Sequence, residues 1–248
     1  MKAVILAAGK GTRLRPITDT MPKPLVRIGG RALLEYILLG LAGAGVRQAA
    51  VVTGYLAEQV EGYFGAGERV GMRLSYFRQR EMTGTATAAL LCEEFVGGEP
   101  FLMTWADILL YWQGYREVVG LFAAERPEMV LGLNWVEDPA AGAAVYLEGD
   151  RITDIIEKPA PGTSTTHWNN AGVMVLSPSI FPAARALAPS PRGEYELPQA
   201  VRHLLQAGAR TLGVRFSGLW SDVGTPQELE RLNVLAREGG LAGAFEPL

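Results

Sequence analysis

The stretch that most constrains the fold of this chain is its N-terminal segment. An apolar run over residues 3–8 is stopped by glycine, and the basic loop Gly9-Lys10-Gly11-Thr12-Arg13 follows at once. Such a run, at the head of a chain in which helix and strand patterns alternate, predicts a central parallel strand. Glycines just past its end free the backbone, so that amide groups can face an anion. The same residues also fit a strand followed by a flexible basic turn.

Two common phosphate-loop patterns are excluded here. Position 14 is leucine, so the dinucleotide-binding pattern of three glycines is incomplete, and no Gly-Lys-Ser/Thr follows to make a P-loop. Arg13, Arg15 and Lys23 nevertheless add fixed positive charge that suits a polyphosphate. The segment therefore favours phosphate binding of another kind.

Composition narrows the class of protein. The chain has 248 residues, is 48% hydrophobic and carries a formal net charge of −3, which argues against nucleic-acid and membrane-surface partners. The length suits one substantial α/β core. Cys92 is the only cysteine, so no internal disulfide forms. Because the first apolar run already meets glycine at Gly9, it lacks the form of a signal peptide, and we expect a cytoplasmic protein.

Periodicity predicts an α/β architecture. In the first half, helices are expected over residues 31–44, 55–64, 85–95 and 117–125, and strands over 48–53, 72–77, 101–105 and 130–136. This alternation predicts a mostly parallel sheet with helices on both faces, whose ligands bind beyond the carboxyl ends of the strands. The second half is richer in strands, expected over 144–147, 151–157, 171–176 and 210–216, with helices over 198–206 and after Thr225.

The N-terminal stretch also carries a resemblance. Leu6-Ala7-Ala8-Gly9-Lys10-Gly11-Thr12-Arg13-Leu14-Arg15-Pro16, followed by Pro22-Lys23-Pro24-Leu25, resembles the signature of the sugar-1-phosphate nucleotidyltransferases. The resemblance implies a Rossmann-like three-layer nucleotidyltransferase fold with a small β-rich sugar-binding lobe. We expect a single domain over 1–248, with a nucleotide-binding half (1–136), a sugar-binding half (137–222) and a C-terminal helix and tail (223–248).

Two aspartates are the candidate metal ligands. Asp107 follows the predicted strand 101–105, and Asp222 lies in Trp220-Ser221-Asp222-Val223-Gly224-Thr225. Carboxylates beside phosphate suit Mg²⁺, which takes oxygen ligands. Each aspartate alone also fits a turn or helix-cap role. The family has metal-binding aspartates at both places, so the resemblance implies Mg²⁺ here. Ala106 stands where the family usually has glycine, which leaves the choice of sugar open.

Gln79 is the candidate reader of the nucleobase. It stands five residues before Gly84, where the family contacts the base. A primary amide both donates and accepts, which matches uracil or thymine, whereas a carboxylate would suit guanine. Without the resemblance, Gln79 reads as an ordinary loop residue. The full implied nucleotide-binding set is Leu6, Ala7, Ala8, Gly9, Gly11, Thr12, Arg13, Lys23, Gln79, Gly84 and Thr85.

The implied sugar-binding set lies in the second half. Glu157 and Lys158 resemble the family's Glu-Lys-Pro element, in which the glutamate takes sugar hydroxyls and the lysine holds the sugar phosphate. A Glu-Lys pair at a strand end is otherwise usually a solvated edge. Gly142 matches a backbone contact to the sugar, and Asn170 matches the family's sugar-binding asparagine.

The resemblance implies that UTP or dTTP condenses with a sugar 1-phosphate, releasing pyrophosphate. Arg13, Lys23 and Lys158 are the expected catalytic residues, acting by charge neutralisation and positioning. The segment Arg192-Gly193-Glu194-Tyr195-Glu196-Leu197 is similar to the thymidylyltransferase branch, which favours glucose 1-phosphate. Three alternatives stay open: another phosphate substrate such as phosphocholine, a purine nucleotide, and a non-catalytic regulatory homologue.

Overall fold

The computed structural model describes residues 1–241, which form two compact units interleaved along the sequence. The first unit takes Met1–Met82, Thr104–Arg116 and the described residues from Gly218 to Leu241; the second takes Thr83–Met103 and Glu117–Ser217. Strand β6 (Phe101–Trp105) and helix α5 (Trp112–Glu125) pass from one unit into the other. The units do not follow the predicted halves 1–136 and 137–222, and the single-domain assignment stays a prediction.

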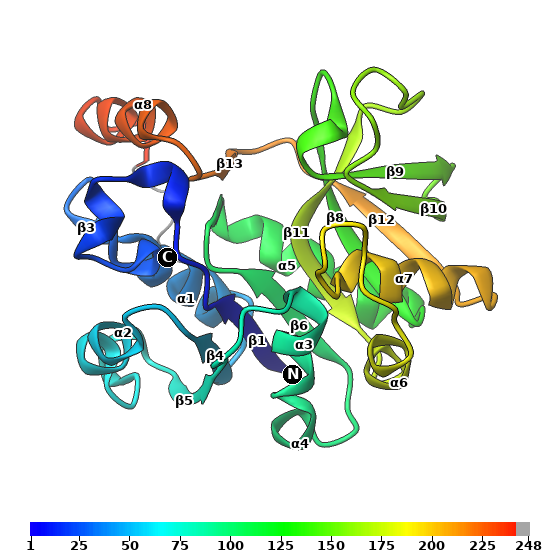
Figure 1. The fold of residues 1–248 in the computed structure, drawn as a ribbon, viewed down its shortest axis with the longest axis horizontal. Coiled ribbons are helices and arrows are strands. Elements are labelled where there is room, and N and C mark those ends of the chain that lie inside the picture. The colour runs from blue at the N-terminus through cyan, green and yellow to red at the C-terminus, as the bar shows by residue number, and fades with distance from the viewer. Residues whose placement is uncertain (242–248) are drawn as a thin grey trace. The chain divides into compact units, whose positions relative to one another are not determined.

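The first unit is built on three parallel strands. Strands β5 (Arg73–Arg78), β4 (Gln48–Thr53) and β1 (Lys2–Ala7) lie side by side in that order (Figure 1). All of β1 from Ala3 onward is buried, as expected for a central strand. The unit also contains α1 (Leu33–Gly43), α2 (Ala57–Phe64), α8 (Pro226–Arg237), β2 (Arg27–Ile28), β3 (Arg31–Ala32), β7 (Ile108–Leu110), β13 (Trp220–Asp222) and the 3₁₀ turns Thr12–Leu14, Ile17–Asp19, Lys23–Leu25 and Glu68–Val70.

One hydrophobic cluster anchors the loops of the first unit. Leu14, Val26, Leu109 and Val223, each at most 1% exposed, pack together with Leu232 of α8. Thr225 begins α8 by accepting a hydrogen bond from the backbone N–H of Glu228, at 3.2 Å, and Pro226 takes the first helical position. The predicted helix start is therefore confirmed, and the loops that carry Arg13, Lys23, Asp107 and Asp222 share one core.

The second unit has a mixed sheet in the order β11-β8-β12-β10-β9. Its strands are β8 (Met129–Trp135), β9 (Ala143–Glu148), β10 (Arg151–Glu157), β11 (Trp168–Leu176) and β12 (Thr211–Arg215). Strand β12 is parallel to β8, and the other pairs are antiparallel. Because β9 also pairs with β11, at Asn169↔Ala144, these strands close on themselves. Its helices are α3 (Thr85–Leu90), α4 (Glu93–Val96), α6 (Ile180–Arg185) and α7 (Leu197–Gln206), with a 3₁₀ turn over Pro139–Ala141.

Most predicted elements are present. The strands expected over 48–53, 101–105 and 151–157 have those bounds, and the Gly149-Asp150 turn joins β9 to β10 as a hairpin. The helix expected over 85–95 is divided into α3 and α4, and α6, β7 and β13 were not predicted. Among the residues described, no helix has the length and apolar character that crossing a bilayer requires. The last part of the predicted tail, 242–248, lies outside the described residues.

Candidate active site

A short two-stranded ladder in the first unit brings the two candidate metal ligands together. Strand β7 pairs antiparallel with β13, so that Ile108 faces Asp222. Next to this pair, the backbone N–H of Val223 donates to the carbonyl of Asp107 at 2.9 Å. Val223 and Leu109 are fully buried in the shared core, which fixes both strands. The ladder therefore sets two aspartates from distant parts of the sequence on neighbouring strand ends.

Lys23 lies between these carboxylates. Its ammonium donates to Asp107 Oδ2 at 2.8 Å and stands 3.6 Å from Asp222 Oδ1. The side chain is only 10% exposed. Its backbone belongs to a 3₁₀ turn closed by hydrogen bonds from Leu25 to Pro22 and from Val26 to Lys23. One cation thus serves two acidic groups, an arrangement whose charges depend on one another.

The surroundings of Asp222 disfavour the ionised form of its carboxyl group. Burial, and then the charge of Asp107, raise its pKa, while Lys23 and Arg13 lower it less. Oδ1 is buried and accepts no hydrogen bond from residues 1–241, and Arg13 Nη2 lies 3.5 Å from Oδ2. A buried carboxylate oxygen without a donor is a fitting ligand for a hard cation. The described residues contain no group of three or more acidic, histidine or cysteine ligands, so protein would supply only part of such a shell.

The glycine loop after β1 is fixed at both ends and open in its middle. Ala8 accepts a hydrogen bond from Tyr55 N–H at 3.1 Å, and Leu6 accepts one from Ala106 N–H at 2.9 Å. Gly11 has φ +62°, and a Cβ there would lie 3.1 Å from Lys23 Cβ. A Cβ on Gly9, by contrast, would meet nothing within 4 Å. Neither backbone conformation nor packing within the protein requires glycine at position 9. Contact between this part of the loop and a nucleotide stays a prediction.

Gln79 follows β5 in the same unit. Its backbone N–H donates to the carbonyl of Thr53 at 2.8 Å, which continues the β4–β5 ladder by one residue. The residue is 8% exposed. It is therefore held at the carboxyl end of a parallel strand rather than lying on an exposed loop. That is the end of the sheet at which α/β proteins bind ligands.

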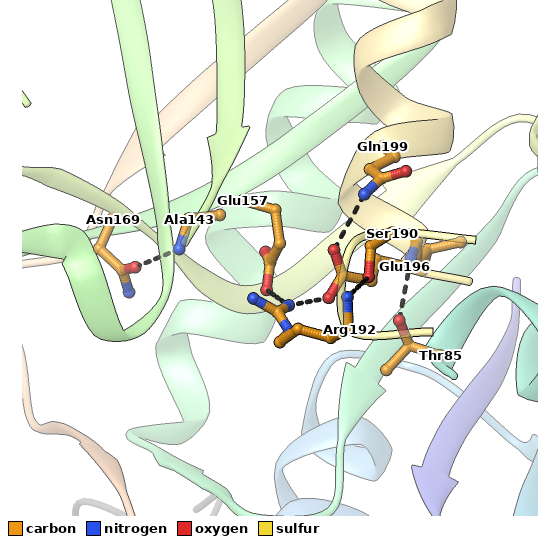
Figure 2. Close-up of polar contacts among 9 residues, drawn as sticks. Thr85, Ala143, Glu157, Asn169, Ser190, Arg192, Glu196 and Gln199 are labelled. Atoms are coloured by element: carbon orange, nitrogen blue, oxygen red, sulfur yellow. Dashed lines mark hydrogen bonds and ion pairs between the residues drawn. The ribbon is translucent and has the colours of Figure 1, made fainter. Parts of the chain in front are cut away.

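In the second unit, Gly84 and Thr85 have packing roles that sequence analysis did not assign. A Cβ on Gly84 would lie 2.3 Å from the carbonyl oxygen of Tyr195, and its φ is +129°. Tyr195 N–H donates to Thr83 O at 2.8 Å, and Leu197 N–H donates to the hydroxyl of Thr85 at 2.9 Å (Figure 2). The start of α3 is thus bound to the segment that precedes α7. Contact of either residue with a nucleotide stays a prediction.

Glu157 lies in a network of polar and charged groups, in which Glu157 and Glu196 are mostly buried and Arg192 is exposed (Figure 2). Arg192 forms an ion pair with Glu196 and stands 3.8 Å from Glu157 Oε1, while Gln199 donates to Glu196 at 3.0 Å. Burial raises the pKa of Glu157, and Lys158 and Arg192 oppose that rise. Since the side chain of Glu157 is only 16% exposed, it is not part of a solvated edge. No role was predicted for Arg192 and Glu196; their opposite charges and their spacing of four residues were the available signal for an ion pair.

The closure of β9 onto β11 shapes the rest of the candidate sugar site. Asn169 Oδ1 accepts from Ala143 N–H at 3.0 Å, and its Nδ2 donates to Asn134 Oδ1 at 2.9 Å. A Cβ on Gly142 would lie 2.1 Å from that same oxygen of Asn169, so only glycine fits there. Lys158 N–H donates to Gly142 O at 2.7 Å, and Lys158 has the left-handed φ of 43°, which is unusual for a residue other than glycine.

Asn170, the predicted ligand, is engaged much less than its neighbour. Its Oδ1 accepts from Gly172 N–H at 3.1 Å, and its Nδ2 contacts only the sulfur of Met174, at 3.9 Å, among the hydrogen bonds described. A sulfur atom is a weak acceptor, so this amide can exchange partners at low cost. Asn169 therefore serves the fold, whereas the Asn170 amide has only a weak acceptor among the hydrogen bonds described, and its contact with a sugar stays a prediction.

We expect the two asparagines to respond oppositely to substitution. Asn169→Ala should lower the free energy of unfolding by about 1–3 kcal/mol, because Ala143 N–H and Asn134 lose a buried partner. Asn170→Ala should change it by less than about 1 kcal/mol but weaken binding of the sugar phosphate. Urea unfolding and isothermal titration with glucose 1-phosphate measure the two effects. Equal losses of stability in both variants would contradict this division of roles.

The site residues thus gather in two groups. The first unit brings together Arg13, Lys23, Asp107 and Asp222 beside the glycine loop, and the second brings together Gly142, Glu157 and Lys158 at the start of β9 and the end of β10.

Comparisons with known proteins agree with the resemblance. The family model described as nucleotidyl transferase matches residues 2–238. A glucose-1-phosphate thymidylyltransferase of Streptomyces griseus is 35% identical over 96% of this chain and 66% of its own length. The UTP–glucose-1-phosphate uridylyltransferase AglF of Haloferax volcanii is 33% identical over 92% of this chain and 93% of its own.

A solved structure extends the likeness to the fold. A crystal structure of UDP-glucose pyrophosphorylase complexed with UDP-glucose has a TM-score of 0.86 and 25% identity, over 96% of this chain and 98% of that one. The predicted α/β fold class is thereby confirmed. The chain spans just under two thirds of the thymidylyltransferase relatives it matches, 66% and 65% of their lengths.

Proposed function

The chain belongs to the sugar-1-phosphate nucleotidyltransferase family, and from that premise we propose that it condenses a pyrimidine nucleoside triphosphate with a sugar 1-phosphate, releasing pyrophosphate. The observation that carries the proposal is the shared ion pair of Lys23 with Asp107 and Asp222, beside Arg13 and the glycine loop. A non-catalytic homologue would have no need to keep this charged group intact.

The proposed reaction mainly requires that the negative charge of the two phosphate groups be neutralised. The attacking oxygen of a sugar phosphate is already an anion at neutral pH, so the reaction needs no general base; the barrier is repulsion between two anionic phosphates. Arg13 and the amides of residues 9–12 would bind the β- and γ-phosphates and stabilise the leaving pyrophosphate. Lys23 would lie at the α-phosphate, and Lys158 would hold the incoming phosphate.

Asp107 and Asp222 would hold Mg²⁺, since both carboxylates share one cation and Asp222 Oδ1 has no donor among residues 1–241. When bound, the ion would neutralise phosphate charge and orient the reacting groups. Before the ion binds, the ammonium of Lys23 would keep the two aspartates from repelling one another.

The second unit would recognise the sugar. The carboxylate of Glu157 would accept hydrogen bonds from sugar hydroxyls, and Asn170 would donate to another. Burial raises the pKa of Glu157, so this carboxyl ionises at a higher pH than an exposed glutamate does. Gly142 would offer a backbone contact. The named relatives act on glucose 1-phosphate, which supports that sugar here.

Gln79 would read a pyrimidine base. Its amide can donate to one carbonyl of uracil or thymine and accept from N3–H. The relatives include both a thymidylyltransferase and a UTP-dependent enzyme, which supports UTP and dTTP alike.

The single cysteine and absence of an internal disulfide support a cytoplasmic setting.

Gln79→Glu should lower kcat/KM for UTP and dTTP about 10-fold or more, because a carboxylate accepts only and would face a base carbonyl without a donor. Activity with GTP should fall less or rise. Gln113→Glu, at an exposed position of α5 outside the candidate site, is the control for added charge. An unchanged ratio of UTP to GTP activity in Gln79→Glu would remove the assigned role.

A pyrophosphate-release assay tests the function itself. It uses UTP, dTTP, GTP and ATP against glucose 1-phosphate, other sugar phosphates and phosphocholine, with and without MgCl₂. We expect magnesium-dependent release with UTP or dTTP and a sugar 1-phosphate. Binding of nucleotide without any release, across the whole panel, would refute the enzyme and favour a regulatory homologue.

A further inference from the structure

Gly224 is a glycine whose backbone does not require one. It follows β13 by two residues, and its φ is outside the left-handed region that favours glycine. Alanine could therefore adopt its conformation without strain. The reason for glycine at this position has to be space.

The space is filled by one side chain. A Cβ on Gly224 would lie 2.9 Å from Arg13 Cζ, 2.9 Å from Nη2 and 3.0 Å from Nη1. Because three atoms of the planar guanidinium are almost equally distant from that point, the flat face of the group lies against Gly224. Arg13 Nη2 also stands 3.5 Å from Asp222 Oδ2. The guanidinium is thus bounded by a carboxylate and by the bare Cα of a glycine.

The surroundings prevent the backbone from yielding. Val223, just before the glycine, is fully buried, and Thr225, just after it, is the N-cap of α8. Leu14, next to Arg13, is buried in the same core as Val223. The Arg13 side chain, by contrast, is 63% exposed and can rotate. An added methyl group at position 224 would therefore displace the guanidinium and leave both backbones in place.

We propose that Gly224 is a positioning residue, which leaves room for the Arg13 guanidinium beside Asp222 and thereby sets the affinity for the triphosphate tail. The inference rests on the proposed function, since that function makes the triphosphate the ligand of Arg13. In this role Gly224 acts through Arg13 and not by its own contact with substrate.

The test compares Gly224→Ala with Gly62→Ala. Gly62 lies in α2 of the same unit, and a Cβ there would meet nothing within 4 Å. In Gly224→Ala we expect UTP and dTTP to bind about 10-fold more weakly by isothermal titration, as for loss of one charge-assisted contact. The melting temperature should stay within about 2 °C of the parent. Gly62→Ala should leave the affinity unchanged.

A double-mutant cycle tests whether Gly224→Ala weakens nucleotide binding through Arg13. In an Arg13→Ala background, Gly224→Ala should weaken binding less than about 2-fold, since the displaced group is gone. An undiminished loss in that background would overturn the proposal. If Gly224→Ala alone misfolds, recovery of the fold in the double variant supports the clash, and failure to recover overturns it.

A measurement without nucleotide separates this inference from the proposed function. The side-chain Nε–H signal of Arg13 in a ¹⁵N NMR spectrum is identified by its loss in Arg13→Lys. It should shift in Gly224→Ala and not in Gly62→Ala. A shift in a protein that binds no triphosphate would refute the proposed function and keep the positioning role. An unmoved signal would overturn the positioning role.

Discussion

Lys23→Ala is expected to lower turnover by a factor on the order of 10² or more, as for the loss of one preorganised charge contact. The ammonium of Lys23 is the only cation within 3 Å of Asp107 among the residues described, and it also faces Asp222. Its removal takes away the charge proposed for the α-phosphate and leaves two neighbouring carboxylates to repel each other. Steady-state kinetics of pyrophosphate release with UTP and glucose 1-phosphate measure the loss.

Two further variants make the Lys23 result specific. Lys23→Met keeps the apolar stem, whose burial supports the fold, and removes only the charge; its turnover should be as low as that of Lys23→Ala. Lys2→Ala removes a lysine at the opposite end of β1 and should leave turnover near the parental value. Near-normal turnover in Lys23→Met would show that the charge is dispensable, which would end the proposed mechanism.

Asp222→Asn should separate activity from stability. Turnover is expected to fall about 10²-fold or more, because the amide no longer supplies a second negative ligand for Mg²⁺ beside Asp107. The metal-free protein, however, should melt at the same temperature as the parent or higher. A neutral side chain of the same shape escapes the cost of ionising beside Asp107 with one oxygen buried.

The pH dependence follows from the direction of the Asp222 shift. Its pKa is raised in the folded state, so the folded protein holds this proton more tightly than the unfolded chain does. The stability gained from that proton is present at low pH and is lost as pH rises through the raised pKa. The melting temperature of Asp222→Asn minus that of the parent should therefore be higher at about pH 8 than at about pH 4.

Magnesium provides the matching control for Asp222→Asn. Adding MgCl₂ at about pH 8 should raise the melting temperature of the parent and raise that of the variant less, since a ligand of the folded state stabilises more when its affinity is higher. A variant that is less stable than the parent at about pH 8 without metal would show that the ionised carboxylate stabilises the fold. That outcome would contradict the inference that the surroundings of Asp222 disfavour its ionised form.

Much of the fold was predictable because its elements have local signals. Strand β4 and strand β10 have the predicted bounds, and the Thr225-Pro226 helix start was readable from side-chain chemistry alone. Strands β7 and β13 have three residues each, too few for any periodic pattern, so they were missed. Their pairing is nonetheless what sets Asp107 beside Asp222.

The candidate sites show the same division. Arg13 and Lys23 could be nominated from their charge beside the glycine loop, because charge belongs to the residue itself. Glu157 and Asn170 were nominated only through the family resemblance. The different contacts of Asn169 and Asn170 could not be predicted from sequence. Adjacent residues of a strand face opposite ways, so Asn169 bonds the backbone of Ala143 while the Asn170 amide contacts only the sulfur of Met174 among the hydrogen bonds described.

By itself, the sequence determined which chemistry this protein carries: a glycine loop with fixed positive charge, two aspartates that suit a hard cation, and an α/β framework. Only the tertiary structure decided which of these groups share an environment. It set Lys23 against both aspartates, left Asp222 Oδ1 without a donor among the described residues, and pressed the face of Arg13 against Gly224. The physical reason is that electrostatic energies and steric limits depend on distances between residues far apart in the chain, which local patterns do not encode.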